Sequence, residues 1–299
     1  MKFKLSLILI FFSLKLFAQN AGSTGYSFLK IGTGAAEVGQ AEAVTSKFIS
    51  PFSLNYNPAL ITQAKFESIG LMHNEWIQDL RSELLAANSE LFGVPIFLIV
   101  NSTSITDIEI RTRPGEATGK FSAYYFSGGI GTGVEVIKDF SIGFQVKYLY
   151  ENIYVDESYG LAFDFGFFKK NLIQDFNAGL SFRNFGQVNQ LSSESTELPS
   201  EVRFGLSYSG NLTFYKFNFY PSLDLQKFTR NGNLNLLVGL ETNYDNLLAF
   251  RVGYNSMRDI NNFSFGLGLN YKSFSFDYAF LPFSNNFGNA NLMSIYVKL

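Results

Sequence analysis

The stretch Asn261-Asn-Phe-Ser-Phe-Gly-Leu-Gly-Leu-Asn-Tyr-Lys-Ser-Phe-Ser-Phe-Asp-Tyr-Ala-Phe280 decides the fold class of this chain. Large apolar residues occupy every second position on both sides of Lys272-Ser273, and Gly, Ser, Asn, Asp and Ala stand between them. Successive side chains of a β-strand point to opposite faces, so the stretch predicts a β-hairpin with one aromatic face and one small or polar face. Such a hairpin suits a soluble sheet that packs on a core, and equally a barrel with lipid outside and a tight, polar interior.

The composition is unusual for a soluble domain. The 299 residues include 34 Phe and 16 Tyr, and aromatic residues make up 17% of the chain. Charged residues make up 16%, against roughly 25% in typical soluble domains. The chain has no Cys and a single His, His73, which excludes disulfides, thiolate metal sites and multi-histidine metal sites. We therefore expect no cofactor.

Residues 1–18 have the three parts of a secretory signal peptide. A basic start is followed by a mostly apolar run from Leu5 to Phe17 and by the small residue Ala18. We expect cleavage after Ala18, because the run is shorter than the ~20 residues that a membrane-anchoring helix needs. Loss of three Lys and no acidic residue leaves 20 basic and 25 acidic residues, a formal charge of −5, which gives no indication of nucleic-acid binding.

After the signal peptide, no apolar run reaches membrane-helix length. An exported, aromatic-rich chain without a helical span fits a transmembrane antiparallel β-barrel, since only helices and closed barrels satisfy their backbone hydrogen bonds in lipid. We expect an all-β fold with about 14 strands, and we take Asp107–Arg111 as a fifteenth strand or part of a long loop. The expected strands are Phe66–Glu75, Asp79–Asn88, Phe92–Ser102, Lys120–Val134, Phe140–Ile153, Ser158–Lys169, Asp175–Phe185, Glu201–Ser209, Thr213–Lys227, Leu234–Tyr244, Leu247–Asn255, Asn262–Tyr271, Ser273–Phe280 and Ala290–Leu299.

Charged residues within these strands fall mostly on the face that carries Gly and Ser. A barrel interior accepts charges, whereas a charge on the lipid face costs roughly 2–4 kcal/mol at mid-membrane. The alternative, a soluble β-sandwich or barrel, would have to bury more Phe and Tyr than one interior face usually holds. The residues expected to face the interior are Lys147, Asp164, Arg183, Arg203, Asp224, Glu241, Arg251 and Asp277.

Residues 19–62 differ from the expected barrel, residues 63–299. They are rich in Ala and Gly, and Ala35 to Val44 could form a short helix. We interpret residues 19–62 as an N-terminal plug or rim segment. Asn57-Pro58 signals a turn, and Asn57, Pro58 and Ala59 are candidates for plug, partner or ligand contacts, with a purely structural turn against the barrel as the alternative.

Short motifs spread over most of the mature chain resemble those of the PorV/PorQ family of outer-membrane β-barrels, which are relatives of the FadL-type barrel. They include Phe28-Leu29-Lys30-Ile31-Gly32, Asn57-Pro58-Ala59-Leu60, Asn184-Phe185-Gly186, Arg203-Phe204-Gly205, Arg251-Val252-Gly253-Tyr254 and Asp277-Tyr278-Ala279-Phe280. The resemblance implies a roughly 14-stranded barrel in the outer membrane. Members of this family take part in the type IX secretion system, whereas FadL relatives pass hydrophobic small molecules.

Other patterns do not point to catalysis. Gly32-Thr33-Gly34 lacks the surrounding β-α unit of a phosphate-binding loop, and His73 has no evident Ser or Cys nucleophile. Asp79 and Glu83 share one strand face, as an acid–base pair would, but solvation in a loop or lumen is the simpler interpretation. We therefore predict a non-enzymatic barrel.

Two functions remain open. The first is an accessory component of a type IX secretion or attachment system, which would act through contacts with secretion-system proteins or secreted substrates. The second is a FadL-like transporter of hydrophobic small molecules, with the N-terminal segment as a movable plug. Both place the chain in the outer membrane, in contact with lipid, and neither involves nucleic acid.

Overall fold

The computed structural model describes residues 24–191, 196–230, 232–256 and 262–299. The expected signal peptide, residues 1–18, lies outside the described residues. One antiparallel sheet closes on itself, because β15 pairs with β1 and β11 pairs with β10. The strands are β1 (Ser68–Glu75), β2 (Leu80–Leu91), β3 (Val94–Ile110), β4 (Gly119–Ile137), β5 (Phe140–Ile153), β6 (Asp156–Ile173), β7 (Phe176–Val188), β8 (Glu201–Tyr208), β9 (Thr213–Phe214), β10 (Phe217–Phe228), β11 (Leu234–Tyr244), β12 (Leu248–Asn255), β13 (Phe263–Tyr271), β14 (Phe274–Pro282) and β15 (Asn289–Lys298).

The barrel has fourteen strand positions. β9 has only two residues, and it shares the same edge of β10 with β8, so the two form one interrupted strand. The prediction of an all-β barrel with about 14 strands is therefore confirmed. Two details of the prediction are wrong. Asp107–Arg111 is neither a separate strand nor a loop, because β3 continues to Ile110 past a register shift between Ile105 and Ile108. The expected strand Thr213–Lys227 is split by a turn at Tyr215, whose φ is positive.

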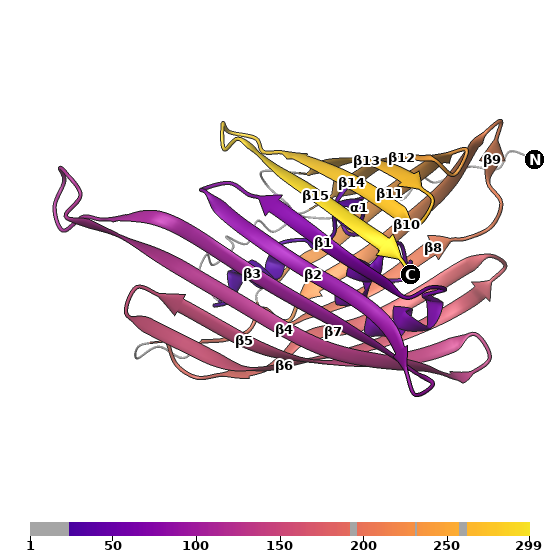
Figure 1. The fold of residues 1–299 in the computed structure, drawn as a ribbon, viewed down its shortest axis with the longest axis horizontal. Helices are drawn as coiled ribbons and strands as arrows, with labels where there is room; N and C mark the ends of the chain where they lie inside the picture. The colour runs from indigo at the N-terminus through magenta and orange to yellow at the C-terminus, as the bar shows by residue number, and fades with distance from the viewer. Residues whose placement is uncertain (1–23, 192–195, 231, 257–261) are drawn as a thin grey trace, which may run out of the picture.

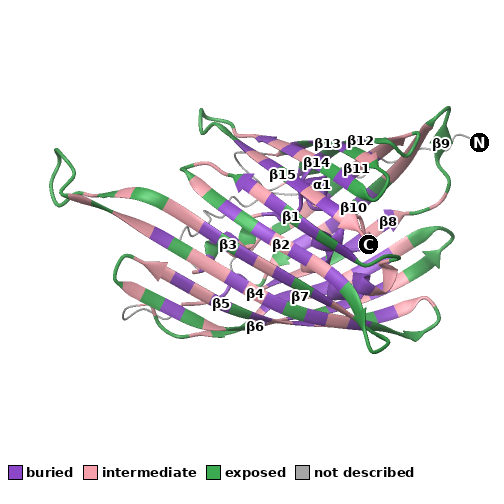
Figure 2. Cartoon of the chain, viewed as in Figure 1, coloured by how far each residue is buried: buried purple, intermediate pink, exposed green. Residues whose placement is uncertain are grey.

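The two faces of the wall differ as the sequence pattern predicts. Along most strands, buried and more exposed residues alternate, which gives the bands of Figure 2. In the opening hairpin, Phe265 faces Phe280 and Leu267 faces Tyr278 across β13 and β14 on the outer side. All eight charged strand residues predicted to face the interior are buried. The outer face therefore presents apolar side chains where a membrane would contact it.

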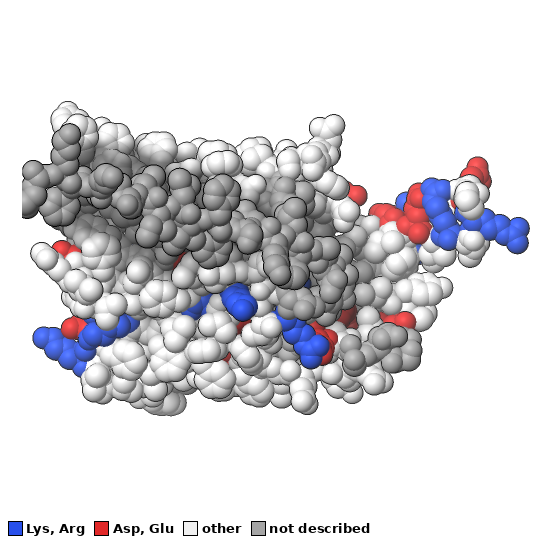
Figure 3. Space-filling model, turned by 180° about the vertical axis from the view of Figure 1, so that it is seen from behind, with Lys and Arg blue, Asp and Glu red and all other residues white. Residues whose placement is uncertain are grey.

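The two ends of the barrel differ in their connections. One end, here called the turn end, holds the start of β1, the end of β15 and tight turns such as Phe92-Gly93 and Lys272-Ser273. The opposite end, the loop end, holds the connections 111–118, 189–200 and 283–288, whereas the turn end has one long connection, 209–216, which contains β9. At the loop end the β3–β4 hairpin extends past its neighbours, and its tip gathers charged groups (Figure 3).

Among the described residues, four short helices precede the wall, and they lie inside the ring of strands (Figure 1). They are η1 (Ser27–Lys30), α1 (Ala35–Val38), η2 (Pro51–Asn55) and η3 (Pro58–Gln63). The predicted helix Ala35–Val44 ends early because Ala41 and Glu42 have φ values of 54° and 63°, which no α-helix accommodates. Within the described ranges, no helix is long and apolar enough to cross a bilayer.

Residues 24–64, here called the interior segment, run through the barrel from one end to the other. At the loop end, Gly25 N donates to Glu197 O (3.0 Å) and Tyr26 Oη donates to Ser158 Oγ (3.0 Å). At the turn end, Thr62 Oγ1 donates to Ser141 Oγ at the start of β5 (2.8 Å). Most residues of the segment are buried, so the segment packs inside the barrel and not at its rim.

Candidate functional site

The three residues singled out in the sequence, Asn57, Pro58 and Ala59, begin η3 and are buried. Asn57 caps this helix, since its Oδ1 accepts from Ala59 N (3.0 Å), and Pro58 occupies the first helical position, where no N–H is needed. Asn57 Nδ2 donates to Phe167 O of β6 (3.0 Å) and to Thr45 O (2.8 Å). The Asn57 side chain therefore holds the helix start, the wall and an earlier turn of the segment together.

Three neighbouring positions of the wall next to these residues are glycines. Gly143 of β5 pairs with Gly133 on one side and with Gly166 on the other. A Cβ at Gly143 would lie 2.3 Å from Ala59 N, and one at Gly166 would lie 2.1 Å from Asn57 Oδ1. Only glycine lets the two backbones approach this closely. The same relation recurs elsewhere along the segment, at Gly179 with Thr45, Gly239 with Gln40 and Gly253 with Ala41.

These contacts explain the glycines that alternate with aromatic residues in the sequence. The outer positions carry large side chains for the membrane, and the inner positions are left bare where the segment rests on the wall. We describe Asn57, Pro58, Ala59 and Gly143 as the glycine seat. A contact between Asn57–Ala59 and a separate partner or ligand stays a prediction.

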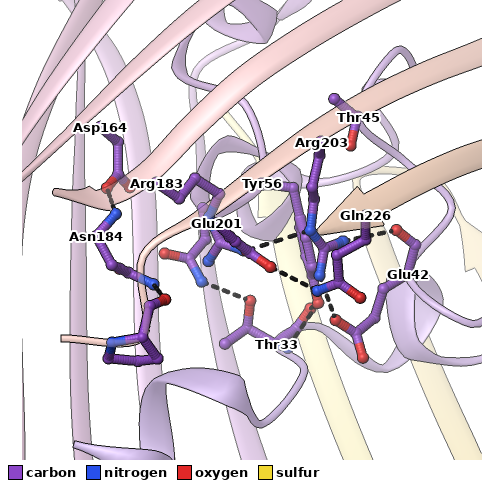
Figure 4. A network of polar contacts seen from close by, with 12 residues as sticks. Thr33, Glu42, Thr45, Tyr56, Asp164, Arg183, Asn184, Glu201, Arg203 and Gln226 are labelled. Atoms are coloured by element: carbon purple, nitrogen blue, oxygen red, sulfur yellow. Dashed lines mark hydrogen bonds and ion pairs between the residues drawn. The ribbon is translucent and has the colours of Figure 1, made fainter. Parts of the chain in front are cut away.

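A buried charge cluster joins the segment to β7 and β8 (Figure 4). Arg203 donates to Glu42 Oε2 and to Glu42 O, each at 3.2 Å, and to Glu201 Oε1 at 3.2 Å. Arg183 also pairs with Glu201. The Tyr56 ring lies 5.2 Å from the Arg203 guanidinium carbon and 5.3 Å from that of Arg183, close enough for cation–π attraction. Each buried charge in this cluster thus has a partner of opposite sign.

A β-bulge supplies two of the inward side chains nearby. Asp164 of β6 has no register partner in β7, because two residues, Arg183 and Asn184, stand opposite it there, and Asn184 has a φ of 60°. Asp164 Oδ1 accepts from the Asn184 N–H (2.7 Å), and Asp164 Oδ2 pairs with Lys147 Nζ (2.8 Å). The bulge turns consecutive residues toward the interior, which a regular strand cannot do.

A second buried charge cluster lies on the side of β11, β12 and β14. Arg251 donates to Glu241 Oε2 (2.8 Å) and to Asp277 Oδ1 (2.6 Å). From the segment, Lys47 Nζ lies 3.7 Å from Glu241 Oε1 and donates to Gln40 Oε1 (3.2 Å). The segment is therefore tied by ion pairs to two separate regions of the wall.

Glu37 of α1 is a buried acid within the segment. Its Oε1 accepts from Ser50 Oγ and from Ser53 Oγ, both at 2.7 Å, which links α1 to η2. Burial raises the pKa of the Glu37 carboxyl to about 7, although both hydroxyl hydrogen bonds favour the ionised form. The link between α1 and η2 therefore contains a group that changes charge near neutral pH.

The loop-end part of the segment is held differently. Tyr26 and Phe28 are buried with Leu149, Ala162 and Leu198, and the Phe28 ring lies 5.4 Å from that of Tyr125. This region is an apolar, aromatic cluster, in contrast to the glycine seat and the charge clusters nearer the turn end.

The remaining sequence candidates do not join these contacts. His73 and Glu83 form a pair 2.6 Å apart on the outer side of β1 and β2, where both side chains are exposed. Among the described residues, no group of three or more His, Cys, Asp or Glu is arranged to hold a metal ion. Gly34 has a φ of 80° and precedes α1, and Asp79 lies in the β1–β2 turn.

Sequence reasoning found the charged side chains of the wall but missed their partners in the segment. Glu37, Glu42 and Lys47 occur in an Ala/Gly-rich stretch with no periodic pattern. The inward charges of the strands, four basic and four acidic, balance one another and so gave no signal of charged partners in the segment.

Comparisons with known proteins support the fold. No family model matches the chain, and no curated protein matches it. A solved structure of the TodX monoaromatic hydrocarbon channel, a deltaS2 mutant, aligns with a TM-score of 0.62 and 12% identity over 90% of this chain and 99% of that one. The Pseudomonas putida toluene transporter TodX gives 0.58 and 11% over 89% and 97%, and a Pseudomonas aeruginosa FadL homologue gives 0.51 and 12% over 88% and 97%.

At this identity the likeness concerns the fold alone, a closed antiparallel β-barrel that this chain shares with the TodX channel and the FadL homologue. The neighbours named here include a monoaromatic hydrocarbon channel and a toluene transporter. The narrower PorV/PorQ kinship is not shown by these comparisons and stays a prediction.

Proposed function

We propose that this protein is an outer-membrane channel for hydrophobic small molecules, closed at rest by its own interior segment. The observation that carries the proposal is the fold likeness to hydrocarbon channels over nine-tenths of the chain. The neighbours are named for toluene and monoaromatic hydrocarbons, so a small apolar solute is the substrate class to test first.

The contacts of the interior segment support this proposal. The glycine seat holds η3 through van der Waals contacts between two closely spaced backbones. Such contacts can form and break without any covalent change. Contacts with several strands span the barrel from Glu197 at the loop end to Ser141 at the turn end, so a solute passing through the interior requires part of the segment to shift. In this proposal residues 24–64 act as a plug.

A role in type IX secretion rests on the sequence resemblance alone. The structures named above are described as a hydrocarbon channel and a toluene transporter. The buried position of Asn57–Ala59 leaves these residues unavailable to a protein partner while the segment is docked. Hydrophobic transport is therefore the better-supported function.

A pair of engineered cysteines tests the plug. The chain has no native Cys, so Thr62→Cys with Ser141→Cys introduces one possible disulfide between η3 and β5, whose hydroxyl oxygens lie 2.8 Å apart. The matched control is Ser82→Cys with Thr103→Cys, a pair of wall residues whose hydroxyl oxygens are also 2.8 Å apart. Uptake of radiolabelled toluene is measured in host cells that lack their own hydrocarbon channel.

We expect wild-type protein to raise toluene uptake, and the oxidised Thr62–Ser141 lock to reduce this gain at least about tenfold. Reduction of the disulfide should restore uptake, and the wall control should transport in both states. Equal uptake by cells with and without the wild-type protein would refute the channel. Full uptake by the oxidised lock would refute the movement of η3.

A further inference from the structure

A groove lies on the outer face of the wall, over the seam where β15 pairs with β1. Its volume is about 470 Å³, which falls within the roughly 300–1,000 Å³ typical of small-molecule sites. The residues that line it come from β1, β2, β3 and β15, so the interior segment takes no part in it. Leu71 and Met293, two of these residues, are 55% and 57% exposed. The groove is therefore open to the surroundings of the barrel and does not depend on docking of the segment.

The part of the groove nearer the turn end is apolar. Strand register places Leu71 of β1 beside Ile295 of β15 and beside Leu85 of β2. Leu85 in turn stands beside Val100 of β3. These four side chains, here called the leucine row, cross four neighbouring strands and line the groove. A row of this kind is the surface that lipid alkyl chains contact on a membrane barrel.

The same strands become polar toward the loop end. His73 is the next outward residue of β1 and stands beside Glu83 of β2. Glu75, the outward residue after it, stands beside Arg81 of β2. Glu75, Arg81 and Glu83 are all exposed. A charge on the outer face of a barrel is costly at mid-membrane and tolerated near the interface, so the step from the leucine row to His73 marks the level at which lipid head groups begin.

This polar part holds two carboxylates close to one imidazole ring. Glu83 Oε1 lies 2.6 Å from His73 Nδ1, and Glu75 Oε1 lies 3.7 Å from His73 Nε2. Arg81 forms no ion pair with any residue in the described part of the chain. Two carboxylates and one guanidinium leave one negative charge in excess while His73 is neutral. The groove thus ends in an anionic pair with a cation beside it.

We propose that this groove binds an aminophospholipid, a lipid whose head carries both a primary ammonium and a phosphate. The ammonium lies between Glu75 and Glu83, the phosphate faces Arg81, and one alkyl chain lies along the leucine row. The inference goes beyond the proposed function, because it concerns the outer face and holds whether or not a solute passes through the interior.

The charges of the site match this head group better than other lipid heads. Glu75 and Glu83 are diagonal neighbours across β1 and β2, at a spacing that long side chains bridge. A primary ammonium has three N–H donors and can bond to both carboxylates, whereas the quaternary ammonium of phosphatidylcholine has none. A guanidinium binds phosphate through paired hydrogen bonds. A purely anionic head would leave the excess carboxylate without a cation.

The position of the groove gives the lipid a structural effect. β1 and β15 are the first and last strands of the wall, and their pairing closes the barrel. A ligand that binds only the closed barrel stabilises it by mass action. The aminophospholipid should therefore stabilise this seam against thermal unfolding.

Native mass spectrometry measures binding to the full-length mature protein, released from detergent micelles that contain one added lipid. The lipids are dioleoyl phosphatidylethanolamine, phosphatidylcholine and phosphatidylglycerol, which share their alkyl chains and differ in the head. The variant is Glu75→Gln with Glu83→Gln, which keeps the size of both side chains. The matched control is Glu109→Gln with Glu116→Gln, which removes two exposed carboxylates from β3 and the connection after it, at the same end of the barrel.

We expect the wild type and the control to bind phosphatidylethanolamine at least about tenfold more tightly than the other two lipids. The Glu75 and Glu83 double variant should lose this preference. Phosphatidylethanolamine should raise the unfolding temperature of the wild type and of the control but not that of the double variant. Addition of a chelator should leave its binding unchanged.

Equal affinity of the wild type for phosphatidylethanolamine and phosphatidylcholine would overturn the proposal, and this comparison needs no variant to fold. Equal phosphatidylethanolamine affinity in the double variant and the control would do the same. Tighter binding of phosphatidylglycerol would show that Arg81 selects an anionic head. Loss of binding with the chelator would show that a divalent cation, and not the ammonium, lies between the carboxylates.

Discussion

The glycine seat allows a direct test of how the segment is held, through Gly143→Ala. The added Cβ would lie 2.3 Å from Ala59 N, 2.4 Å from Pro58 C and 2.6 Å from Ala59 Cα, where ordinary contacts need 3.4–4 Å. All three atoms belong to the backbone, so no side-chain rotation relieves the clash. The segment must therefore move away by about 1 Å or more, a displacement that follows from these distances.

The energetic cost follows from this displacement. Overpacking of a close-packed site costs typically about 1–3 kcal/mol. For undocking from a folded wall, the effect of alanine on strand backbone entropy cancels between the docked and undocked states. A loss of 1–3 kcal/mol corresponds to a roughly 5- to 150-fold rise in the undocked population.

Hydrogen exchange of the amides of residues 59–61 in detergent micelles measures this population. The matched control is Gly128→Ala, since a Cβ there would meet only the flexible Phe126 ring, at 3.2 Å. We expect faster exchange in the Gly143 variant by the factor above and wild-type exchange in the control, with the barrel folded in both. Equal protection in the two variants would refute the close-approach argument.

Three further predictions concern charge. Burial raises the pKa of Glu37 to about 7, so the folded state binds the Glu37 proton more tightly than the unfolded chain does. Docking of the segment should therefore weaken as pH rises from about 4.5 to 7. Glu37→Gln should remove this pH dependence of the hydrogen-exchange protection of the segment. Arg203→Met leaves the carboxylates of the first charge cluster without their shared cation and should lower the free energy of unfolding by about 3–5 kcal/mol in guanidinium titrations. Leu267→Arg, at mid-strand on the outer face, should cost about 2–4 kcal/mol in refolding into bilayers, against about 0–1 kcal/mol for Tyr271→Arg at the strand end.

Each of these has an outcome that contradicts it. A pH profile that is the same in the Glu37 variant would show that another group titrates. If Arg203→Met lowers the free energy of unfolding by as little as the exposed Arg230→Met does, the cluster is not buried in solution. Equal refolding of the two outer-face variants would mean that Leu267 does not face lipid.

The sequence by itself determined the wall. Side chains of a strand repeat every two residues, so a local pattern such as Phe263 to Tyr271 indicates both that the stretch is a strand and which of its faces is apolar. The inward placement of Lys147 and Arg251 follows from the same period, and so does the approximate number of strands. The split of Thr213–Lys227 at Tyr215 and the full length of β3 were missed, because they depend on which neighbour each strand pairs with.

Only the tertiary structure decided what fills the interior. Gly143 and Gly166 leave space on the inner face of the wall, but the strand sequence does not identify the group that occupies this space. Glu42 and Arg203 are 161 residues apart, and no local period connects them. The interior segment lacks a repeating pattern because its side chains contact several different strands at once. The partner of each buried charge is therefore set by closure of the barrel around residues 24–64, and the sequence alone could not assign it.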